Sequence, residues 1–498
     1  MNKLVIPSAG TSTRFYELGK KYPKILLPYK NKPILTHVIS KVVEDFDRVV
    51  LVVRNNKDLY KEVIEYYNLQ NIEIREVNTS IKQGPGTSAF CGIDGNEESV
   101  TIMLSDAIYD FKISEMPEDS ISVMEVEDYA RWCMVDESIE FYDKPSEEPN
   151  TNLAVSGIYK ISNPSLYYEI SSQIIYSNNT YKEVEFSNIL EKYNKKNKLK
   201  LHKHSSSKFL DFGTIEKYIK NKDLPLSRSF NNIVFYNNKV KKISTLNREK
   251  VIKEGLWLKY FPIMREYIPN TLNINFLEAS IEIERIYGFT LRDLLLYYDN
   301  SNNLWNKIFN NLNYFIDNCS KHKIDTKSFW ENILAKTFMR DNYKNNEFNE
   351  YFKHLIKKSP VYSESTLFHG DLVFSNIIYS SNSENLKFFD PRGELYGHWV
   401  YDLAKIGQSV LGNYDLIDSE MYLSEKNFYK IFSTDREKIQ KIFFEVFEDK
   451  INFLTKKLFY CLIASLYLSL IPLHSHNKKN QELYMEEFDY FYKLSQKN

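Results

Sequence analysis

Two separate stretches of this 498-residue chain carry small, amide-bearing and charged residues in the spacing that phosphate chemistry uses. In the first stretch, a short apolar run leads into Ser8, Ala9 and Gly10, and the cations Arg14 and Lys24 follow. A small loop that contains glycine lets backbone N–H groups approach phosphate oxygens, and the start of a following helix adds partial positive charge. We therefore expect Ala9 and Gly10 to cradle the phosphates of a nucleotide, with Arg14 and Lys24 neutralising their charge.

Further residues of the first stretch suit the remaining parts of a nucleotide and of a second substrate. Gln83 and Gly84 place an amide side chain and a flexible backbone before a predicted helix, which suits the reading of a base edge. Because an amide can present its oxygen or its nitrogen, Gln83 leaves cytosine and uracil both open. Asp106 ends an apolar run, where a carboxylate can hold Mg²⁺ against phosphates, and Asp211 supplies a second carboxylate. Lys144 offers a cation near the second substrate.

The second stretch reads His369-Gly370-Asp371, and Asn376 and Asp390 come after it. Asp371 and Asn376 are five residues apart, the interval of the protein kinase catalytic loop, in which the aspartate receives the hydroxyl proton and the asparagine holds Mg²⁺. Asp390 closes a second predicted strand, the place of the other metal-binding aspartate of kinases. The pattern predicts phosphoryl transfer, with Asp371 as the base and Asn376 and Asp390 as metal ligands on a hairpin. We expect His369 to be structural.

Residues upstream of this second stretch suit the binding of ATP. Lys242 is expected on a strand and Glu254 on the next helix, so that the two pair and orient the ATP phosphates as in kinases. Lys241 is the alternative for this contact. Glu282 and Glu284 belong to a segment that looks like the hinge against which adenine hydrogen-bonds.

The order and spacing of the first set resemble the family of sugar-phosphate and choline-phosphate nucleotidyltransferases, over nearly all of residues 1–220. The segment Asp-Phe-Gly-Thr-Ile-Glu-Lys-Tyr that begins at Asp211 is similar to that family's Asp-Ile-Gly-Thr-Pro-Glu-Asp-Tyr. One departure is Ser12, which stands where the family's loop usually has a second glycine. The resemblance implies these roles: Gly10, Arg14 and Lys24 bind the triphosphate, Gln83 and Gly84 the base, Lys144 the incoming phosphate, and Asp106 and Asp211 the Mg²⁺.

Residues 230–498 resemble the family of aminoglycoside phosphotransferases and choline kinases. The resemblance is carried by the HGDxxxxN pattern from His369 to Asn376, by Asp390, and by the segment Tyr-Asp-Leu-Ala-Lys around Asp402. It implies that Asp402 braces the catalytic loop without doing chemistry. The glycine-rich loop of kinases is missing, and a short Asn turn at 237–238 is expected to cover the phosphates.

Apolar patterning divides the chain into an α/β domain at 1–224 and a second domain at 225–498. Continuous β-branched or aliphatic runs at 4–6, 49–53 and 100–104, alternating with helical patterns, predict a doubly wound mixed sheet whose ligands sit at the carboxyl ends of its strands. The resemblance implies that this domain has the GT-A-like fold of nucleotidyltransferases. The second domain is expected to be α+β and protein-kinase-like, with a small lobe at about 225–290 and a helical lobe at about 291–498.

Composition limits the kinds of partner and compartment. Lys and Arg number 65 against 66 Asp and Glu, so a net charge of −1 gives no broad basic field for nucleic acid. Four cysteines without CxxC spacing argue against disulfides and a cysteine zinc site, which fits a reducing cytoplasm. The chain begins directly with structural residues, and the apolar run at 458–473 is interrupted by serine and proline. We therefore expect a cytoplasmic protein without membrane insertion, whose ligands are small molecules and which can form a homodimer.

Together the two sites predict a bifunctional enzyme that uses Mg²⁺, ATP and a second nucleoside triphosphate. One half phosphorylates a small hydroxyl compound, and the other transfers a nucleotidyl group to that phosphate and releases pyrophosphate. Similar pairs of proteins serve bacterial capsule or lipopolysaccharide pathways, so the resemblance favours CTP and an amino alcohol, polyol or similar acceptor. A sugar kinase joined to a sugar-1-phosphate nucleotidyltransferase is the alternative, and a half that only senses ligand or serves as a scaffold is another. A dinucleotide-binding domain is disfavoured because the chain lacks GxGxxG at this loop.

Overall fold

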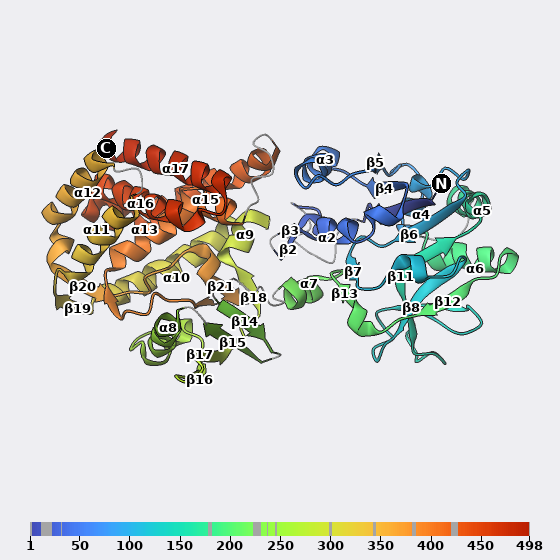
Figure 1. Ribbon diagram of the computed structural model, residues 1–498, viewed down its shortest axis with the longest axis horizontal. Helices are drawn as coiled ribbons and strands as arrows, with labels where there is room; N and C mark the ends of the chain where they lie inside the picture. The colour runs from blue at the N-terminus through green and yellow to red at the C-terminus, as the bar shows by residue number, and fades with distance from the viewer. Residues whose placement is uncertain are drawn as a thin grey trace. The chain divides into compact units, whose positions relative to one another are not determined.

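The computed structural model separates the chain into two compact units, Met1–Lys222 and Asp223–Asn498 (Figure 1). The structure describes residues 2–10, 22–30, 32–177, 182–222, 231–236, 238–244, 247–297, 301–341, 345–380, 385–419 and 427–497. The domain boundary predicted between 224 and 225 lies outside these residues. The two units are described one after the other.

A mixed sheet forms the centre of the first unit, and nine strands of it lie in the described residues. Seven of them pair in the order β10 (Phe141–Asp143), β9 (Cys133–Val135), β11 (Leu153–Ile161), β6 (Ser99–Met103), β1 (Asn2–Ser8), β4 (Arg48–Val53) and β5 (Ile72–Glu76), and β8 (Ser120–Glu125) joins β12 (Lys200–Lys203) to β11. Strands β6, β1, β4 and β5 are parallel, whereas β11 runs antiparallel to β6. The three apolar runs predicted as parallel strands are therefore confirmed.

Helices pack on the sheet through the apolar positions of their sequences. The helices of this unit are α2 (Ile34–Ser40), α3 (Lys57–Tyr66), α4 (Pro85–Gly92), α5 (Pro164–Tyr176), α6 (Phe186–Lys196) and α7 (Ile215–Lys222). Ala89 of α4, Ile174 of α5 and Ile189 of α6 share one buried cluster with Val5 and Ile102 of the central strands. Each aliphatic side chain buried in this way contributes about 1.5–3 kcal/mol, so the cluster fixes the strands whose ends carry the polar residues.

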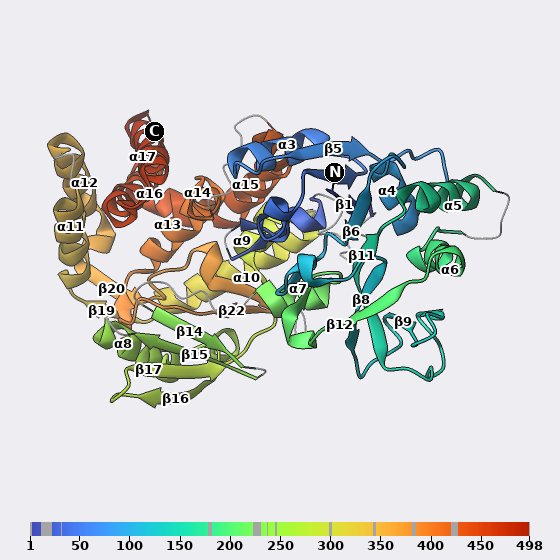
Figure 2. The ribbon, with the colours of Figure 1, turned by 45° about the vertical axis from the view of Figure 1, so that its right-hand side comes forward.

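A small antiparallel sheet begins the described part of the second unit. Its strands pair in the order β14 (Asn231–Phe235), β15 (Lys239–Ser244), β17 (Ser280–Glu284) and β16 (Thr271–Asn275), and α8 (Arg248–Tyr260) connects β15 to β16. Figure 2 shows this sheet and α8 together. A Cβ atom at Gly255 would lie 2.5 Å from Cγ2 of Ile281, so the glycine lets α8 approach β17 closely. The two strands predicted around the Asn turn at 237–238 are confirmed as β14 and β15.

The rest of the second unit is mainly helical. Its helices are α9 (Leu291–Tyr297), α10 (Asn302–Ser320), α11 (Ser328–Arg340), α12 (Asn346–Lys358), α13 (Trp399–Val410), α14 (Tyr414–Asp418), α15 (Asn427–Leu454), α16 (Lys456–Leu470) and α17 (Lys478–Lys497). A three-stranded sheet of β18 (Gly288–Thr290), β21 (Ile377–Ser380) and β22 (Leu386–Phe388) lies among them. Strand β18 falls in the range assigned to the small lobe but pairs with β21 of the helical part.

The apolar run at 458–473 forms α16 and the short helix that follows it. By length and composition, Lys456–His474 is apolar enough to cross a membrane, and 61% of its most apolar window is buried inside the protein. Phe459, Leu462 and Tyr467 are fully buried, and α13 and α17 pack on this helix. Within the second unit, α16 is thus a core helix, as the sequence predicts.

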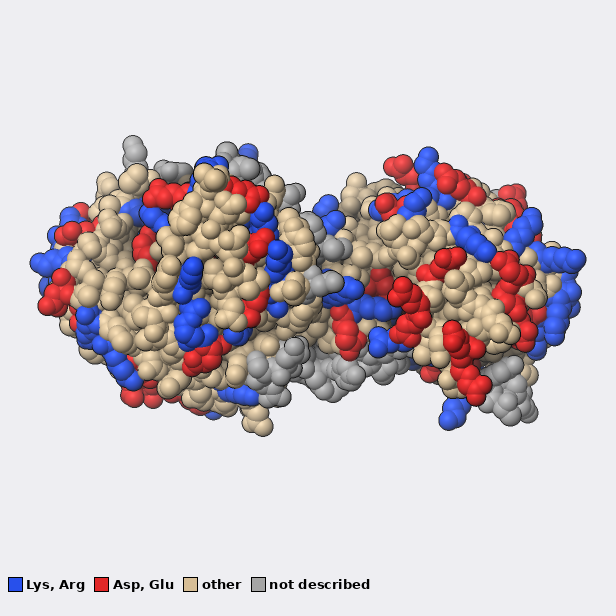
Figure 3. Space-filling view, turned by 90° about the horizontal axis from the view of Figure 1, so that it is seen from below, with Lys and Arg blue, Asp and Glu red and all other residues tan. Residues whose placement is uncertain are grey.

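The surface mixes charges of both signs. On the face shown in Figure 3, Lys and Arg side chains alternate with Asp and Glu side chains on each unit. This distribution matches the near balance of 65 basic and 66 acidic residues in the sequence.

Candidate active sites

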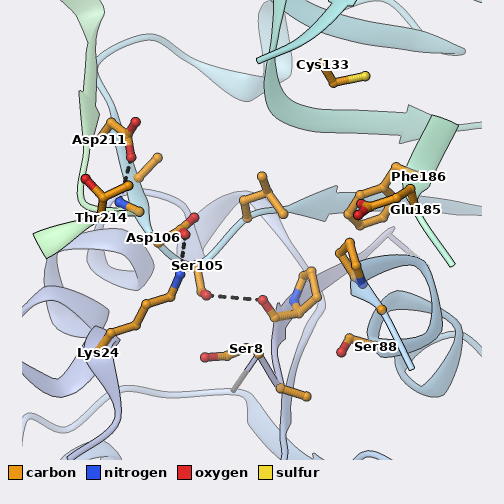
Figure 4. Close-up of a pocket in the computed structure, with 18 of the residues that line it drawn as sticks. Ser8, Lys24, Ser88, Ser105, Asp106, Cys133, Glu185, Phe186, Asp211 and Thr214 are labelled. Carbon is orange, nitrogen blue, oxygen red and sulfur yellow. Dashed lines mark hydrogen bonds and ion pairs between the residues drawn. The ribbon is translucent and has the colours of Figure 1, made fainter. Parts of the chain in front are cut away.

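The carboxyl ends of the parallel strands in the first unit open into a cavity of ≈ 1280 Å³ (Figure 4). Residues 7–10 end and follow β1, residues 54–56 follow β4, and residues 104–106 follow β6, and all of them line the cavity. In open α/β sheets ligands bind at this edge, because the loops after neighbouring parallel strands converge there. The cavity therefore lies where the sequence predicts a nucleotide.

Asp106 and Asp211 come from distant parts of the chain and meet at this cavity. The strands β7 (Ala107–Tyr109) and β13 (Phe209–Asp211) pair antiparallel, and the N–H of Phe212 donates to the carbonyl of Asp106 at 2.7 Å. A Cβ atom at Gly213 would lie 3.0 Å from Oδ1 of Asp211 and 3.3 Å from Oδ2 of Asp106. Because position 213 is a glycine, the space between the two carboxylates is left open.

Two lysines neutralise these carboxylates. Lys24 pairs with Asp106, a contact drawn in Figure 4, and Lys217 pairs with Asp211. The Nζ of Lys217 also lies 4.3 Å from the centre of the Trp132 ring, which holds the ammonium at the cavity wall. The predicted cation Lys24 and both predicted metal ligands are therefore brought together in one place.

The pair Asp106 and Asp211 fits a hard divalent cation better than a transition metal. Among the described residues, no group of three or more His, Cys, Asp or Glu side chains is placed to hold a metal ion. Two carboxylates beside an open space are what Mg²⁺ uses when phosphate oxygens and water complete its coordination. Asp106 and Asp211 would hold the ion, which would polarise the phosphate and neutralise developing charge.

Gln83 and Gly84 line the same cavity, but internal contacts engage both. The Nε2 of Gln83 donates to the carbonyls of Asn78 at 3.1 Å and Ile81 at 2.6 Å, and its Oε1 accepts from Arg54 at 2.7 Å. Arg54 also donates to the carbonyl of Ala9 at 2.8 Å, so it ties the loop after β1 to Gln83. This network orients the Gln83 amide with its oxygen toward Arg54.

Gly84 occupies a backbone conformation that favours glycine. Its φ is 136°, and a Cβ atom there would lie 2.5 Å from the carbonyl oxygen of Val184. The backbone of Val184 exchanges hydrogen bonds with Gln83 and Gly86, at 2.8 and 2.9 Å. The glycine thus permits the close approach of a second backbone at the start of α4, in addition to any contact with a base.

The remaining predicted residues of the first site differ in what the structure shows of them. Lys144 lines the cavity, and its Nζ lies 3.8 Å from Asp143 and 4.0 Å from Glu185, so its cation is only loosely paired. Gly10 lines the cavity, and a Cβ atom there would meet no atom of the described residues within 4 Å. Arg14 and Ser12 lie outside the described residues.

In the second unit, the predicted base and its asparagine are in direct contact. The Nδ2 of Asn376 donates to the carbonyl oxygen of Asp371 at 3.0 Å and to its Oδ2 at 3.1 Å. These donations leave the Oδ1 of Asn376 as the atom able to bind a cation. Lys405 of α13 lies with its Nζ 3.1 Å from the other carboxylate oxygen of Asp371.

Asp390 is brought to the same place by the β21–β22 hairpin. The N–H of Phe389 donates to the carbonyl of Asn376 at 3.1 Å, which places the residues that follow β22 beside the loop that carries Asp371 and Asn376. Asp390 itself adopts a positive φ of 58° and pairs with Lys242 of β15. The three predicted residues of the phosphoryl-transfer site, Asp371, Asn376 and Asp390, are therefore neighbours.

The predicted pair of Lys242 and Glu254 is confirmed, with Nζ and Oε2 2.5 Å apart. Lys241 points to a different partner, Glu278, at 2.7 Å. Burial lowers the pKa of Lys242, but the carboxylates of Asp390 and Glu254 outweigh it and raise that pKa. Burial and the nearby Asp390 raise the pKa of Glu254 to about 7, against the opposing effect of Lys242.

Asp402 braces the loop that begins at His369, as the resemblance implies for this residue. Its two carboxylate oxygens accept the backbone N–H groups of His369 at 2.7 Å and Gly370 at 2.8 Å. Burial raises the pKa of Asp402 to about 7, although these hydrogen bonds lower it. Burial also lowers the pKa of His369 to about 4, so the imidazole, which packs edge-on against Trp257, is neutral.

The predicted hinge connects the small sheet to β18. Glu282 pairs with Lys239 at 3.1 Å, and Glu284 accepts from the Nδ2 of Asn270 at 2.7 Å and lies 3.6 Å from Lys387. Both carboxylates are therefore engaged within the protein. A contact with adenine through this segment stays a prediction.

Three cations near the two sites were missed at the sequence level. Lys217 and Lys405 stand within the segments that carry the family resemblances, six residues after Asp211 and three residues after Asp402. The resemblances assign roles only to the two acids. Arg54 directly follows the apolar run of β4, and its place at a strand's carboxyl end was the signal available.

Comparison with known proteins relates the first unit to nucleotidyl transferases. The model of the family described as nucleotidyl transferase matches residues 3–226. The bifunctional protein GlmU of Methanococcus maripaludis (strain C5) is 26% identical over 167 residues, which cover 32% of this chain and 40% of that protein. A UTP–glucose-1-phosphate uridylyltransferase, AglF, of Haloferax volcanii is 25% identical over 182 residues, which cover 33% of this chain and 73% of that protein.

A solved structure of the CTP:phosphocholine cytidylyltransferase of Streptococcus pneumoniae is also similar, at 14% identity and a TM-score of 0.38, over 45% of this chain and 98% of that one. The chain spans less than half the length of the first Methanococcus relatives that it matches. Residues 3–226, with the cavity at the carboxyl ends of their parallel strands, form a nucleotidyl transferase domain.

Proposed function

We propose that the chain couples two reactions, the phosphorylation of a small hydroxyl compound by ATP and the transfer of a nucleotidyl group to the resulting phosphate. The first unit would carry out the nucleotidyl transfer and the second the phosphorylation. The product is a nucleoside-diphosphate-linked building block, of the kind that surface polysaccharide synthesis consumes. Both triphosphates are cytoplasmic metabolites, so we place the protein in the cytoplasm.

In the nucleotidyl transfer, an oxygen of the phosphate monoester attacks the α-phosphorus of the triphosphate. A new P–O bond forms, the bond between the α-phosphorus and the bridging oxygen breaks, and pyrophosphate leaves. No protein nucleophile is required, which agrees with a cavity whose polar residues are carboxylates and cations. Lys24 would neutralise the triphosphate, and Lys144 would position the incoming phosphate.

In the phosphorylation, the acceptor hydroxyl attacks the γ-phosphorus of ATP and gives its proton to Asp371, while the bond to the β-phosphate oxygen breaks and ADP leaves. Asn376 and Asp390 offer the oxygens that would hold Mg²⁺, which would neutralise charge on the phosphates. Lys242, held by Glu254, would orient the ATP phosphates. The observation that carries this half is the convergence of Asp371, Asn376, Asp390 and the Lys242–Glu254 pair on one place from separate strands and helices.

CTP is the favoured second triphosphate because of the resemblance to choline-phosphate transferases. The alternative is an NDP-sugar product. One observation supports it: the name of the Haloferax relative specifies UTP and glucose 1-phosphate. The oxygen of the Gln83 amide accepts from Arg54, and its nitrogen donates to backbone carbonyls. Because both ends of the amide already have partners within the protein, Gln83 does not by itself select one base.

The two halves can be tested separately on the full chain. Pyrophosphate release is measured with Mg²⁺, each nucleoside triphosphate in turn and ready-made phosphate monoesters of amino alcohols, polyols and sugars. ADP formation is measured with Mg²⁺, ATP and the corresponding unphosphorylated compounds. The proposal expects pyrophosphate release with one base and one class of monoester, and ADP formation with the matching free hydroxyl compound. ADP formation with no acceptor preference, or none at all, would remove the second half of the proposal.

A further inference from the structure

Four cations of the second unit lie near one another, and one of them, Lys405, contacts the predicted base Asp371. Lys336 and Arg340 lie on α11, Arg392 follows the β21–β22 hairpin, and Lys405 lies on α13. We call these four residues the cationic cluster. Lys242, the expected ATP contact, belongs instead to β15 of the small sheet.

The members of the cationic cluster lie close to one another around Tyr401. Lys336, Arg340 and Tyr401 line the same small pocket, the guanidinium of Arg392 lies 5.7 Å from the Tyr401 ring centre, and the Nζ of Lys405 lies 6.0 Å from it. Burial, together with the charges of Arg392, Arg340 and Lys405, lowers the pKa of Lys336 to about 8. The cations therefore repel one another from partly buried positions.

The neighbouring carboxylates do not pair with every member of the cationic cluster. Lys405 is paired with Asp371 at 3.1 Å, and the Nε of Arg392 is paired with Glu394 at 3.0 Å. The Nη1 of Arg392 is buried and has no hydrogen-bond partner in the part of the chain that the structure describes. Among the described residues, Lys336 and Arg340 have no hydrogen-bond or ion-pair partner.

Asp402, the other acid near Lys405, is directed to the backbone of His369 and Gly370. A buried donor without an acceptor and two partly buried, unpaired cations are costly, and an anion is the ligand that offsets this cost.

The position of the cluster connects it with the acceptor and not with ATP. The N–H of Arg392 donates to the carbonyl of His369 at 3.0 Å, and Lys405 touches the carboxylate of Asp371. The guanidinium of Arg392 lies 5.8 Å from the Phe329 ring centre, between α11 and α13. An acceptor whose hydroxyl group contacts Asp371 would therefore have the cationic cluster beside it. The expected ATP contact, Lys242, reaches the site from the small sheet.

We propose that the acceptor of the second unit is a hydroxyl compound that also carries a carboxylate or a phosphate, and that Lys336, Arg340 and Arg392 bind this anionic group. The proposal rests on the phosphorylation proposed for this unit and names its substrate class. It predicts that cationic acceptors such as choline are poorer substrates than anionic ones, because an ammonium group would face three like charges.

The test uses the full chain and acceptors that differ in charge at similar size. D-Glycerate, glycerol and choline are compared as substrates for ADP formation, and the binding of D-glycerate and of ADP is measured by calorimetry. The same measurements are made on Lys336→Met and Arg340→Met, and on Lys441→Met as a control at an exposed lysine of α15. Lys144→Ala reports any binding of glycerate in the first unit.

We expect glycerate to be the better substrate by about tenfold or more, and glycerate affinity to fall by about tenfold or more in Lys336→Met and Arg340→Met, because each variant loses a charge-assisted contact. Lys441→Met and Lys144→Ala should bind glycerate as the unaltered chain does. Equal or better use of glycerol or choline overturns the proposal. So does glycerate binding that is absent, unchanged in the two cluster variants or lost in Lys144→Ala.

Two further outcomes separate this proposal from the one on which it rests. If the cluster variants lose affinity for ADP and not for glycerate, the cluster binds the nucleotide and the proposal is wrong. If glycerate binds through the cluster but no acceptor is phosphorylated, the anion site stands and the proposed phosphorylation fails.

Discussion

The ammonium of Lys405 lies 3.1 Å from Oδ1 of Asp371. Asn376 donates to the other carboxylate oxygen of Asp371 at 3.1 Å, so both oxygens of the proposed base have partners. Burial lowers the pKa of Lys405, but Asp371 and Tyr401 together outweigh burial and raise that pKa, so the lysine stays charged. Lys405 is thus a positioning residue that fixes the direction of the Asp371 carboxylate.

Replacing Asp371 by asparagine should remove phosphorylation while preserving the fold. The amide keeps the shape of the side chain but cannot accept the hydroxyl proton, so we expect ADP formation to fall by about 10²–10⁴-fold. Pyrophosphate release from a ready-made phosphate monoester should be unchanged, because it takes place in the first unit. An enzyme that still phosphorylated its acceptor at the normal rate would show that Asp371 is not the base.

Replacing Asp106 by asparagine should have the opposite pattern. The loss of one of the two carboxylates beside Gly213 weakens Mg²⁺ binding and charge stabilisation, and we expect nucleotidyl transfer to fall by about 10²–10³-fold while ADP formation persists. Asp110→Asn is the matched control, because Asp110 is exposed and pairs with Lys41. Normal transfer at ordinary Mg²⁺ concentrations in Asp106→Asn would remove this residue from the metal site.

Gly84→Ala should destabilise the first unit, whereas Gly10→Ala should not. At Gly84 the added Cβ would lie 2.5 Å from the carbonyl oxygen of Val184 at a φ of 136°, and at Gly10 it would lie within 4 Å of none of the atoms that the structure describes. We expect a loss of about 2 kcal/mol or more for the first substitution. Hydrogen exchange of the amides in β1 and α4, followed by mass spectrometry, measures it. Equal protection in the two variants would contradict the packing described for Gly84.

The second unit should lose stability as the pH falls below 6.5, in part through His398. This residue is fully buried and caps α13 by accepting the N–H of Val400 at 3.3 Å, and burial followed by the charge of Lys323 lowers its pKa to about 3. In the unfolded state the His398 imidazole is therefore protonated below about pH 6.5, whereas in the folded state it stays neutral until the pH approaches 3. Between pH 6.5 and 5, the unfolding free energy should fall by about 2 kcal/mol more in the unaltered chain than in His398→Asn.

Urea unfolding followed by tryptophan fluorescence measures this difference, because Trp257, Trp305, Trp330 and Trp399 belong to the second unit. His354→Asn, at an exposed position of α12, serves as the control and should keep the pH dependence of the unaltered chain. The same slope in His398→Asn would mean that another group sets the acid sensitivity.

Local sequence patterns were sufficient for the elements and for pairs that those elements bring together. The apolar runs at 4–6, 49–53 and 100–104 predict strands because parallel strands are buried on both faces. The Lys242–Glu254 pair could be predicted because a strand and the helix that follows it pack together.

Contacts between distant segments could not be predicted in the same way. Arg54 reaches Gln83 across the sheet edge, and Lys336 reaches the neighbourhood of Lys405 from a helix that carries no motif. Such approaches depend on how helices and loops pack over long sequence separations, which periodicity does not encode. The cationic cluster is the clearest example, since its four members come from three segments.

The central claim is that one chain performs both reactions in sequence. The most direct measurement incubates the purified chain with Mg²⁺, ATP, each second nucleoside triphosphate and a panel of amino alcohols, polyols, hydroxy acids and sugars, and identifies the products by mass spectrometry. We predict a nucleoside-diphosphate-linked compound that forms only when ATP and one particular second triphosphate are both present. A phosphorylated acceptor that is never converted further, or a linked product that forms without ATP from an unphosphorylated acceptor, would contradict the account.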